Sequence, residues 1–595
     1  MDKMKPFFPI ALLLFSSLAS ASLNDVYVAQ GAAGANTGID CANAHAVAFF
    51  NTPGNWGAAA TQIGQDTTVH LCGTVTTALT FSGSGTSGHP ITLLWETGAG
   101  VSPPTCGFSC VNTEGYDYLV LDGGTNGIIE NTANGSLLPN QAVSYGIVAP
   151  SCNGCEIKNL TIRNLYVHTP PNTLVSIIGN GSTATGTCTA SCSFVTGVTA
   201  YIIGNSVAGF NNVSFPVLTA SGRTFTFSSA TTGTGTGGIV GDISGDDTGT
   251  RGIDIGGNNW TVHNNVLHDI AWALWNSYGA GADVGGRIYN NEIYNIDHGI
   301  IVRGWGPNDV GPFYIYNNHI HDFQNWDNPG GHWHHDGIHV FSSNAGGGCP
   351  NVTELWIYNN LFDGDAGDNM TGHIFLEGGA CSGGTPWTRP VADGGTGRAI
   401  VFNNVFIGTP DRVVNGYVQV GSSRGSEVYN NTLLCSNTNI CFVANNALSY
   451  RFKNNFVSGS SNVLVVFGGT TSFASPNDLN NNVYANCISS GHNCFSWHGI
   501  TYTDDFAAWK TVTSGDGNSV AALGDTAAVN PVGVPLAGSP LIGAGVNLAS
   551  VGIAALNLDR IGAPRPPSTA WTVGAYTFTG SKLPEPPTGV TAVGK

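Results

Sequence analysis

Charged residues are scarce in this sequence, and lysine is absent from its long central part. Only 9% of the 595 residues are charged, the formal net charge is -18, and no lysine lies between Lys158 and Lys453. Binding to phosphate needs clustered lysine and arginine, so this balance disfavours nucleic acid and anionic membrane surfaces as general partners. The low positive charge does not exclude an acidic polysaccharide, which a few local cations can bind.

Long apolar segments are also missing after the N-terminus, so we expect no membrane span. The first residues predict a signal peptide over residues 1–21, because Lys3 and Lys5 precede an apolar run from Phe7 to Leu18 and the small residues Ala19 to Ala21 offer a cleavage site. The run is shorter than the roughly 20 residues that a spanning helix needs. The sequence therefore predicts a secreted protein, extracellular, periplasmic or at the cell surface.

The cysteines point to the same compartment. All 14 can be paired with a neighbour along the chain, which is typical of oxidised loop staples in exported proteins. Cys152 and Cys155 have the spacing of zinc ligands, but no second CxxC motif or spaced histidine pair follows them. The expected pairs are Cys41–Cys72, Cys106–Cys110, Cys152–Cys155, Cys188–Cys192, Cys349–Cys381, Cys435–Cys441 and Cys487–Cys494.

Glycine is abundant, with 83 residues, and favours turns and strands over helices. A phrase of aromatic or β-branched residues, then Asn-Asn, then alternating apolar residues recurs, mostly at intervals of 24 to 27 residues. The period of two predicts short strands, and a unit of this size must stack on its neighbours to bury its apolar side. The doublets begin at Asn264, Asn290, Asn317, Asn359, Asn403, Asn430, Asn454 and Asn481.

Asparagine at a fixed place in each coil can form a ladder of amides about 4.8 Å apart. A propeller or β-sandwich is the alternative, but propeller blades run about 40 residues and sandwiches show no asparagine register. We predict an all-β, single-stranded right-handed parallel β-helix with loop insertions and disulfide staples. Further coils are expected around Asn159, Asn164 and Asn205, and a loop or side hairpin from Thr219 to Asp247.

Several motifs resemble one family. The segment GSGTSGHPITLLWE and the C-terminal phrases SPLIGAG from Ser539, DRIGAPRP from Asp559 and WTVGAYTF from Trp571 resemble the pectate-lyase-like superfamily of right-handed β-helix proteins from bacteria. The resemblance covers most of residues 24–579 and implies the fold rather than a reaction. It suggests a β-helix over 22–579, with an N-terminal cap over about 22–150, central coils over about 151–500, a closing segment over about 501–579, and a proline-rich tail over 580–595.

One wall of the predicted solenoid gathers polar residues next to the longest insertions, which commonly carry function. Aligning coils on the doublets places HGIIVRG, DGIHVFS and TGHIFLEG on successive rungs of one strand. With Ile300, Val302, Ile338 and Val340 inward, the side chains of the intervening residues turn outward. The residues expected to converge within roughly 10 Å are His298, Arg303, Asp336, His339 and Glu377, the last after a one-residue bulge.

Two chemistries fit this group. In a lyase, Arg303 would neutralise the carboxylate of a uronic acid while His339 or His335 takes the adjacent proton. In an inverting hydrolase, Asp336 and Glu377 would act as acid and base, since carboxylates two rungs apart suit the roughly 6.5–9.5 Å of that mechanism. We expect β-elimination from a uronic-acid polymer rather than hydrolysis. The alternative outside enzymes is a non-catalytic, adhesin-like solenoid that binds polysaccharide, and the Ser- and Thr-rich loops favour it.

The phrase HHDGIHV is similar to the Asn-Thr-Asp-Gly strand of polygalacturonases, but their remaining motifs do not follow it. Asp246 and Asp247 precede Asp336, which is the wrong order for that family. Lysine-based catalysis, as in some β-helix lyases, has no lysine between Lys158 and Lys453 to use. Arginine is therefore the expected cation.

The remaining expectations concern binding. Four residues are predicted to bind substrate, namely His298, His334, Trp305 and Trp333, and the two tryptophans would stack on sugars. Two residues of the group also have possible structural roles: Arg303 can pack on Trp305 through a cation–π contact, and Asp336 can cap a turn before a glycine. His268, His319 and His321 follow doublets and are interpreted as ladder or bend residues. We expect a monomer. A Ca²⁺ site is conceivable in one short loop, because hard cations bind clustered carboxylates, and the alternative is a solvated turn. The carboxylates of this loop are Asp363, Asp365 and Asp368.

Overall fold

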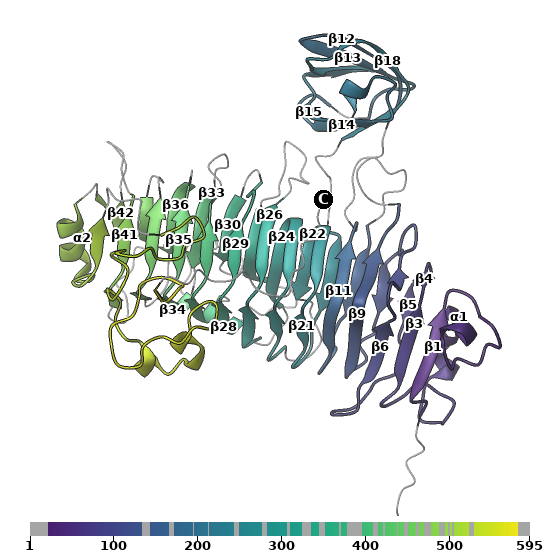
Figure 1. Ribbon diagram of the computed structural model, residues 1–595, viewed down its shortest axis with the longest axis horizontal. Coiled ribbons are helices and arrows are strands. Elements are labelled where there is room, and N and C mark those ends of the chain that lie inside the picture. The colour runs from purple at the N-terminus through teal and green to yellow at the C-terminus, as the bar shows by residue number, and fades with distance from the viewer. Residues whose placement is uncertain are drawn as a thin grey trace, which may run out of the picture.

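The chain folds into a right-handed parallel β-helix, as the asparagine doublets predict (Figure 1). A 36-stranded sheet winds through the coils, and an 8-stranded sheet lies outside it. No helix in the described part of the chain is long and apolar enough to cross a membrane. The computed structural model describes residues 22–580 except 134–142, 166–171, 194, 212, 243–248, 277–282, 306–309, 324–334, 344–351, 368–369, 378–395, 409–413, 421–422, 437, 446–449, 460–462, 469–477, 487–493, 498–499, 503–504 and 523–528.

Each central coil contributes to three faces, which we number in chain order within the coil. β22 (Val266–Asn276) and β24 (Glu292–Trp305) each run through the second face and on into the third. The first face, which leads into the doublets, contains β21 (Thr261–His263), β23 (Arg287–Tyr289), β25 (Phe313–Tyr316), β28 (Val352–Tyr358), β31 (Thr396–Phe402), β34 (Ser423–Tyr429), β37 (Tyr450–Lys453) and β40 (Asp478–Asn480).

The second and third faces are built in the same way, by parallel pairing of one coil with the next. The second face continues with β26 (His319–Phe323), β29 (Leu361–Asp363), β32 (Val405–Ile407), β35 (Thr432–Cys435), β38 (Phe456–Gly459), β41 (Val483–Ala485) and β44 (Val520–Ala522). The third face contains β10 (Tyr145–Ala149), β20 (Arg251–Ile255), the second halves of β22 and β24, β27 (His335–Ser343), β30 (Met370–Leu376), β33 (Val414–Val420), β36 (Thr438–Asn445), β39 (Val463–Gly468) and β42 (Phe495–Trp497).

The two asparagines of a doublet have different structural roles. The first turns the chain, with φ between 51° and 58° in every doublet, a left-handed conformation that asparagine tolerates better than most residues. The second is buried, and its Nδ2 donates to the Oδ1 of the second asparagine one coil further on at 3.0 to 3.3 Å. The predicted vertical register is confirmed along Asn265, Asn291, Asn318, Asn360, Asn404, Asn431, Asn455 and Asn482.

The interior follows the predicted alternation. Ile300, Val302, Ile338 and Val340 are almost completely buried and belong to one apolar core that extends along the solenoid. Because side chains alternate along a strand, the residues between them on β24 and β27 face outward. The polar residues of the third face therefore rest on a rigid, fully packed layer.

Both ends of the solenoid are capped (Figure 1). α1 (Val47–Phe50) packs at the N-terminal end, and Trp509 of α2 (Phe506–Thr513) is buried at the other. The first coils pair in parallel through β1 (Asp25–Ala29), β3 (Thr68–Cys72), β6 (Ile91–Trp95), β9 (Leu119–Glu130) and β11 (Glu156–Arg163), with short strands β2 (His45–Ala46), β4 (Thr74–Val75), β5 (Leu79–Thr80), β7 (Gly100–Val101) and β8 (Ser109–Asn112); β43 (Ile500–Tyr502) pairs antiparallel with β42.

The described residues between 172 and 242 form an antiparallel sheet with its own apolar core. The prediction of a solenoid coil around Asn205 is therefore wrong: the Oδ1 of Asn205 accepts a local hydrogen bond from the N–H of Val207 at 3.1 Å and belongs to no ladder. The expected side hairpin is present as two paired strands of this sheet. The strands are β12 (Asn172–Asn180), β13 (Thr183–Cys188), β14 (Thr199–Ile203), β15 (Val213–Pro216), β16 (Thr219–Ser221), β17 (Thr224–Ser228), β18 (Thr232–Thr236) and β19 (Ile239–Asp242).

The closing segment folds back along the later doublets. The side chains of Asn403, Asn454 and Asn481 donate to backbone carbonyls of residues 558, 546 and 544 at 2.8 to 3.0 Å. Arg565, buried in this segment, donates through Nη2 to the Oδ1 of Asn403 at 2.8 Å. The first asparagine of a doublet thus also anchors the C-terminal region.

Five of the predicted disulfides are confirmed, namely Cys41–Cys72, Cys106–Cys110, Cys152–Cys155, Cys188–Cys192 and Cys435–Cys441. Cys494 is disulfide-bonded as well. Cys349, Cys381 and Cys487 lie outside the described residues, as do the predicted signal peptide and nearly all of the proline-rich tail. Disulfides are typical of extracellular proteins.

Candidate functional site

The candidate site lies on the third face, where β24, β27 and β30 are neighbours. β24 enters this face after a bend at Asn295, whose φ is 53°. Parallel register then sets His298 beside Asp336, Ile301 beside His339 and Arg303 beside Phe341. A register shift between β27 and β30 follows His335, so the bulge that the sequence predicts is present.

A chain of side-chain contacts links three rungs. The Nδ1 of His339 lies 3.2 Å from the Oδ2 of Asp336, and its Nε2 lies 3.2 Å from the Oε2 of Glu377. Asp336 is also 3.4 Å from the Nε2 of His298. Asp336 is completely buried, whereas the side chain of Glu377 is 29% exposed. His339 therefore connects a buried carboxylate to one that reaches solvent.

Asp297 extends this series of side-chain contacts and was not predicted from the sequence. Its carboxylate contacts the Nδ1 of His298 and the Nδ1 of His335, each at 2.7 Å. Burial alone would raise the pKa of Asp297, but the two histidines hold it well below its usual range. Burial alone would likewise lower the pKa of His298, but Asp297 and Asp336 raise it to about 10. His298 is thus a cation that fixes both carboxylates in place.

A cationic and aromatic wall adjoins the histidines. The Cζ of Arg303 lies 5.7 Å from the ring centre of Trp275 and 5.8 Å from that of Phe341. Arg251, which pairs with Asp254, lies 4.3 Å from the same indole ring. Burial and the neighbouring Arg251 lower the pKa of Arg303 to about 10, so it remains a cation at neutral pH. The ring centre of His339 lies 4.9 Å from that of Phe341.

The structure brings most of the predicted residues together. His298, Arg303, His335, Asp336, His339 and Glu377 lie on one wall, and His335 is buried beneath it against Asp297. Trp333 and His334, and the side chain of Trp305, lie outside the described residues, so their predicted roles in substrate binding stay predictions.

The two described residues of the loop predicted to bind Ca²⁺ contact other groups of the protein. The Oδ1 of Asp363 contacts the Nε2 of His319 at 2.7 Å, and the Oδ1 of Asp365 accepts from the backbone N–H of Gly367 at 3.0 Å. Asp368 lies outside the described residues. Two other groups in the described chain bring three ligand atoms within 4.8 Å of one another: His298, Asp336 and His339, and on the second face Glu292, His319 and His321.

The sequence marks Asp297 only as one of several acidic residues beside a histidine. An Asp-His or His-Asp pair follows three consecutive doublets, at His268-Asp269, Asp297-His298 and His321-Asp322, and in each pair the carboxylate contacts the adjacent imidazole. In contrast, the placement of Arg251 beside Arg303 could not be found by aligning doublets, because the insertion at 172–242 separates β20 from the coil before it.

No family model and no curated protein matches the chain. Among solved structures it is similar to pectate lyase Pel9A, with 14% identity, a TM-score of 0.40, and 94% of this chain and 98% of that one covered. It is also similar to the GH136 lacto-N-biosidase from Eubacterium ramulus, with 12% identity, a TM-score of 0.36 and coverage of 84% and 68%. For the A-module of the mannuronan C-5 epimerase AlgE6 from Azotobacter vinelandii these values are 11%, 0.27, 77% and 91%. Similarity at this level says nothing of substrate or chemistry.

Proposed function

We propose that the third face cleaves an acidic extracellular polysaccharide by β-elimination at a uronic acid. The observation that supports this most is that His339 and Arg303 both lie beside the half-buried ring of Phe341, His339 on the same strand and Arg303 on the neighbouring one. A proton acceptor and a fixed cation thereby adjoin one surface on which a sugar ring can stack. Elimination needs these two groups, because the proton removed lies next to the carboxylate that the cation neutralises.

Arg303 supplies the cation in this proposal. A guanidinium binds a carboxylate through two parallel hydrogen bonds, and withdrawal of charge from the carboxylate makes the neighbouring C–H more acidic. Arg251 and Trp275 support it from the preceding coils. Two guanidinium groups on one indole ring give a local positive surface on a chain whose net charge is -18.

His339 supplies the base. Its Nδ1 faces the buried Asp336, so Asp336 stabilises the imidazolium that forms when Nε2 takes the proton from the sugar. The electron pair of that C–H bond forms the new C=C bond, and the bond from the next carbon to the glycosidic oxygen breaks. The oxygen leaves with the electron pair of that C–O bond and takes a proton from water, and the hydroxide that remains takes the proton from the imidazolium. Glu377 occupies Nε2 in the free protein and, being partly exposed, is free to move aside for the sugar.

The burial of Asp336 disfavours inverting hydrolysis. That mechanism requires two carboxyl groups that both reach the sugar, one as acid and one as base. Asp336 is 0% exposed and contacts His298 and His339, so it cannot touch a polymer on the face. Glu377 alone does not provide the second group.

We also propose that the protein is exported, with residues 1–21 as its signal peptide. The disulfides support this proposal because such bonds form and persist in oxidising compartments. An extracellular solenoid with a partly exposed cationic wall suits a long acidic polymer.

The test is incubation of the purified protein with a panel of acidic and neutral polysaccharides, while the ultraviolet absorbance of unsaturated uronates and the number of reducing ends are followed. We expect both signals from the wild-type protein on an acidic polymer. On that polymer, His339→Gln should lower kcat/KM at least about 100-fold, as expected for loss of a general base. Arg303→Gln should lower it about 10- to 100-fold through loss of a charged hydrogen-bonding group.

Two variants serve as matched controls. Arg287, on the first face, also stacks on an aromatic ring of the next coil, with its Cζ 4.6 Å from the ring centre of Tyr314. His263 on that face contacts Glu156 at 2.8 Å. Arg287→Gln and His263→Gln should retain wild-type activity. Activity that survives in both His339→Gln and Arg303→Gln, or reducing ends without ultraviolet absorbance, would refute the proposal.

A further inference from the structure

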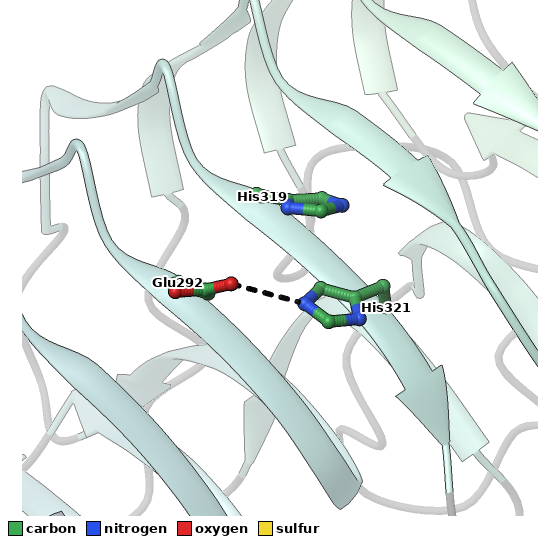
Figure 2. A group of neighbouring side chains, drawn as sticks. All are labelled: Glu292, His319 and His321. Carbon is green, nitrogen blue, oxygen red and sulfur yellow. Dashed lines mark ion pairs between the residues drawn. The ribbon is translucent and has the colours of Figure 1, made fainter. Parts of the chain in front are cut away.

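A second group of titratable side chains lies on the second face, away from the proposed elimination centre. Glu292 begins β24, and His319 and His321 lie on β26 in the next coil (Figure 2). Register sets His319 beside Glu292 and His321 beside Tyr294. Ile320, between the two histidines, is buried in the core, so both imidazoles project outward on the same side as Glu292.

We propose that Glu292, His319 and His321 bind one divalent transition metal ion of the zinc type. One ligand atom from each residue lies within 4.8 Å of the other two. His319 and His321 were interpreted from the sequence as ladder or bend residues, but the ladder is formed by the second asparagines of the doublets and does not include the two imidazoles. The site is independent of the proposed elimination reaction.

The Nε2 atom of His321 carries the strongest evidence. It is buried and has no hydrogen-bond partner in the described part of the chain. The Oε1 of Glu292 lies 3.6 Å away, which is too long for a hydrogen bond (Figure 2). An ion with bonds of about 2.0–2.1 Å to both atoms would span this gap at an angle of roughly 120°, close to tetrahedral. The gap therefore has the size of a metal bridge.

Each histidine is oriented by a carboxylate on its other side. The Nδ1 of His321 contacts the Oδ2 of Asp322 at 2.8 Å, and the Nε2 of His319 contacts the Oδ1 of Asp363 at 2.7 Å. Metal-binding histidines commonly donate their second N–H to such a carboxylate, which fixes the tautomer and strengthens the ligand. This arrangement leaves the Nε2 of His321 and the Nδ1 of His319 for the ion.

The two imidazole rings of this group lie face to face. The two imidazole rings are stacked with their centres 4.0 Å apart. The carboxylates nearby then balance the charge of the ion.

The ligand set selects the class of metal. Two imidazole nitrogens and one carboxylate suit Zn²⁺ and related ions, while Ca²⁺ and Mg²⁺ prefer oxygen ligands alone. The side chain of His319 is 35% exposed, so solvent can reach the ion and complete its coordination. Asp363, expected from the sequence to bind Ca²⁺, instead holds a histidine of this site.

The test is calorimetric titration of the full-length protein with zinc chloride after treatment with a chelator, with circular dichroism as the check of folding. We expect one equivalent of zinc per chain to be lost in His321→Gln and in Glu292→Gln. Asp322→Asn should weaken binding about 10- to 100-fold, because it removes only an orienting group. His263→Gln, which alters a histidine–glutamate pair on the first face, should bind like the wild type. Co²⁺ in place of zinc should give the visible absorption of a tetrahedral site.

Two results would overturn the proposal. One is a folded wild-type protein that takes up no zinc. The other is equal zinc uptake by the wild type and by both His321→Gln and Glu292→Gln, which would place the ion elsewhere, for example at His298, Asp336 and His339. If one variant does not fold, the other and Asp322→Asn still decide between these outcomes.

Discussion

At the scale of single residues, His373 shows how tightly the wall of the solenoid is packed. It lies on β30, is 2% exposed, and is surrounded by the rings of Phe362 and Tyr417 at 5.4 and 5.1 Å. Burial lowers the pKa of His373 to about 3. The folded protein therefore keeps this imidazole neutral at pH values where an unfolded chain would protonate it.

This burial predicts a dependence of stability on pH. The pKa of an unfolded histidine is about 6.5, so the unfolded state gains a proton below that pH while folded His373 does not. The free energy of unfolding should fall as the pH drops from about 6.5 toward 3, by at most about 1.4 kcal/mol per pH unit from this residue. His373→Phe should lose less stability than the wild type between pH 7 and pH 5 in thermal unfolding (about the range in which a free histidine titrates). Equal losses in the two proteins would contradict this account of His373.

At the scale of elements, the asparagine ladder joins each strand pair to the next coil. The Oδ1 of Asn360 accepts from the N–H and the Nδ2 of Asn318, and its Nδ2 donates to the carbonyl oxygen of Ile315 and the Oδ1 of Asn404. All these groups are remote from solvent. The ladder is continuous across the two long intervals around Asn359, so the insertions there leave the coils in register.

Asn360→Ala should break the ladder in the middle of the solenoid. Each buried donor left without an acceptor costs about 1–3 kcal/mol, so we expect the free energy of unfolding to fall by on the order of 3 kcal/mol or more. Asn359→Gly is the matched control, because glycine accepts its φ of 58°, and should change stability by less than about 1 kcal/mol. Denaturant unfolding followed by tryptophan fluorescence measures both. A loss no larger for Asn360→Ala than for Asn359→Gly would refute the role of the ladder.

The elements that the sequence predicts are those whose signal is local and repeated. Doublets with alternating apolar residues specify strands, their faces and their order, and so place Arg303, Asp336 and His339 on one wall. The sheet of residues 172–242 carries no doublet, and its Gly- and Thr-rich strands resemble loops in composition. Asp297 was missed because an acidic residue beside a histidine does not show from sequence whether it is buried.

At the scale of the whole molecule, stacking is what creates both proposed sites. Neighbouring rungs are about 4.8 Å apart, so residues separated by a whole coil or more in the sequence meet as direct neighbours. The third face and the second face of the same coils present different chemistry, a cationic wall with His339 and an imidazole–carboxylate group with His321. The core beneath them is common, which holds both groups rigid.

The central claim is that the third face breaks its polymer by elimination. Mass spectrometry of the oligosaccharides released from an acidic polysaccharide by the wild-type protein tests it most directly. Elimination predicts a terminal uronate with a C=C bond at each new non-reducing end, lighter by one water than the corresponding hydrolysis product. Products whose new non-reducing ends carry a saturated uronate, with a hydroxyl group where the glycosidic bond was, would contradict the claim.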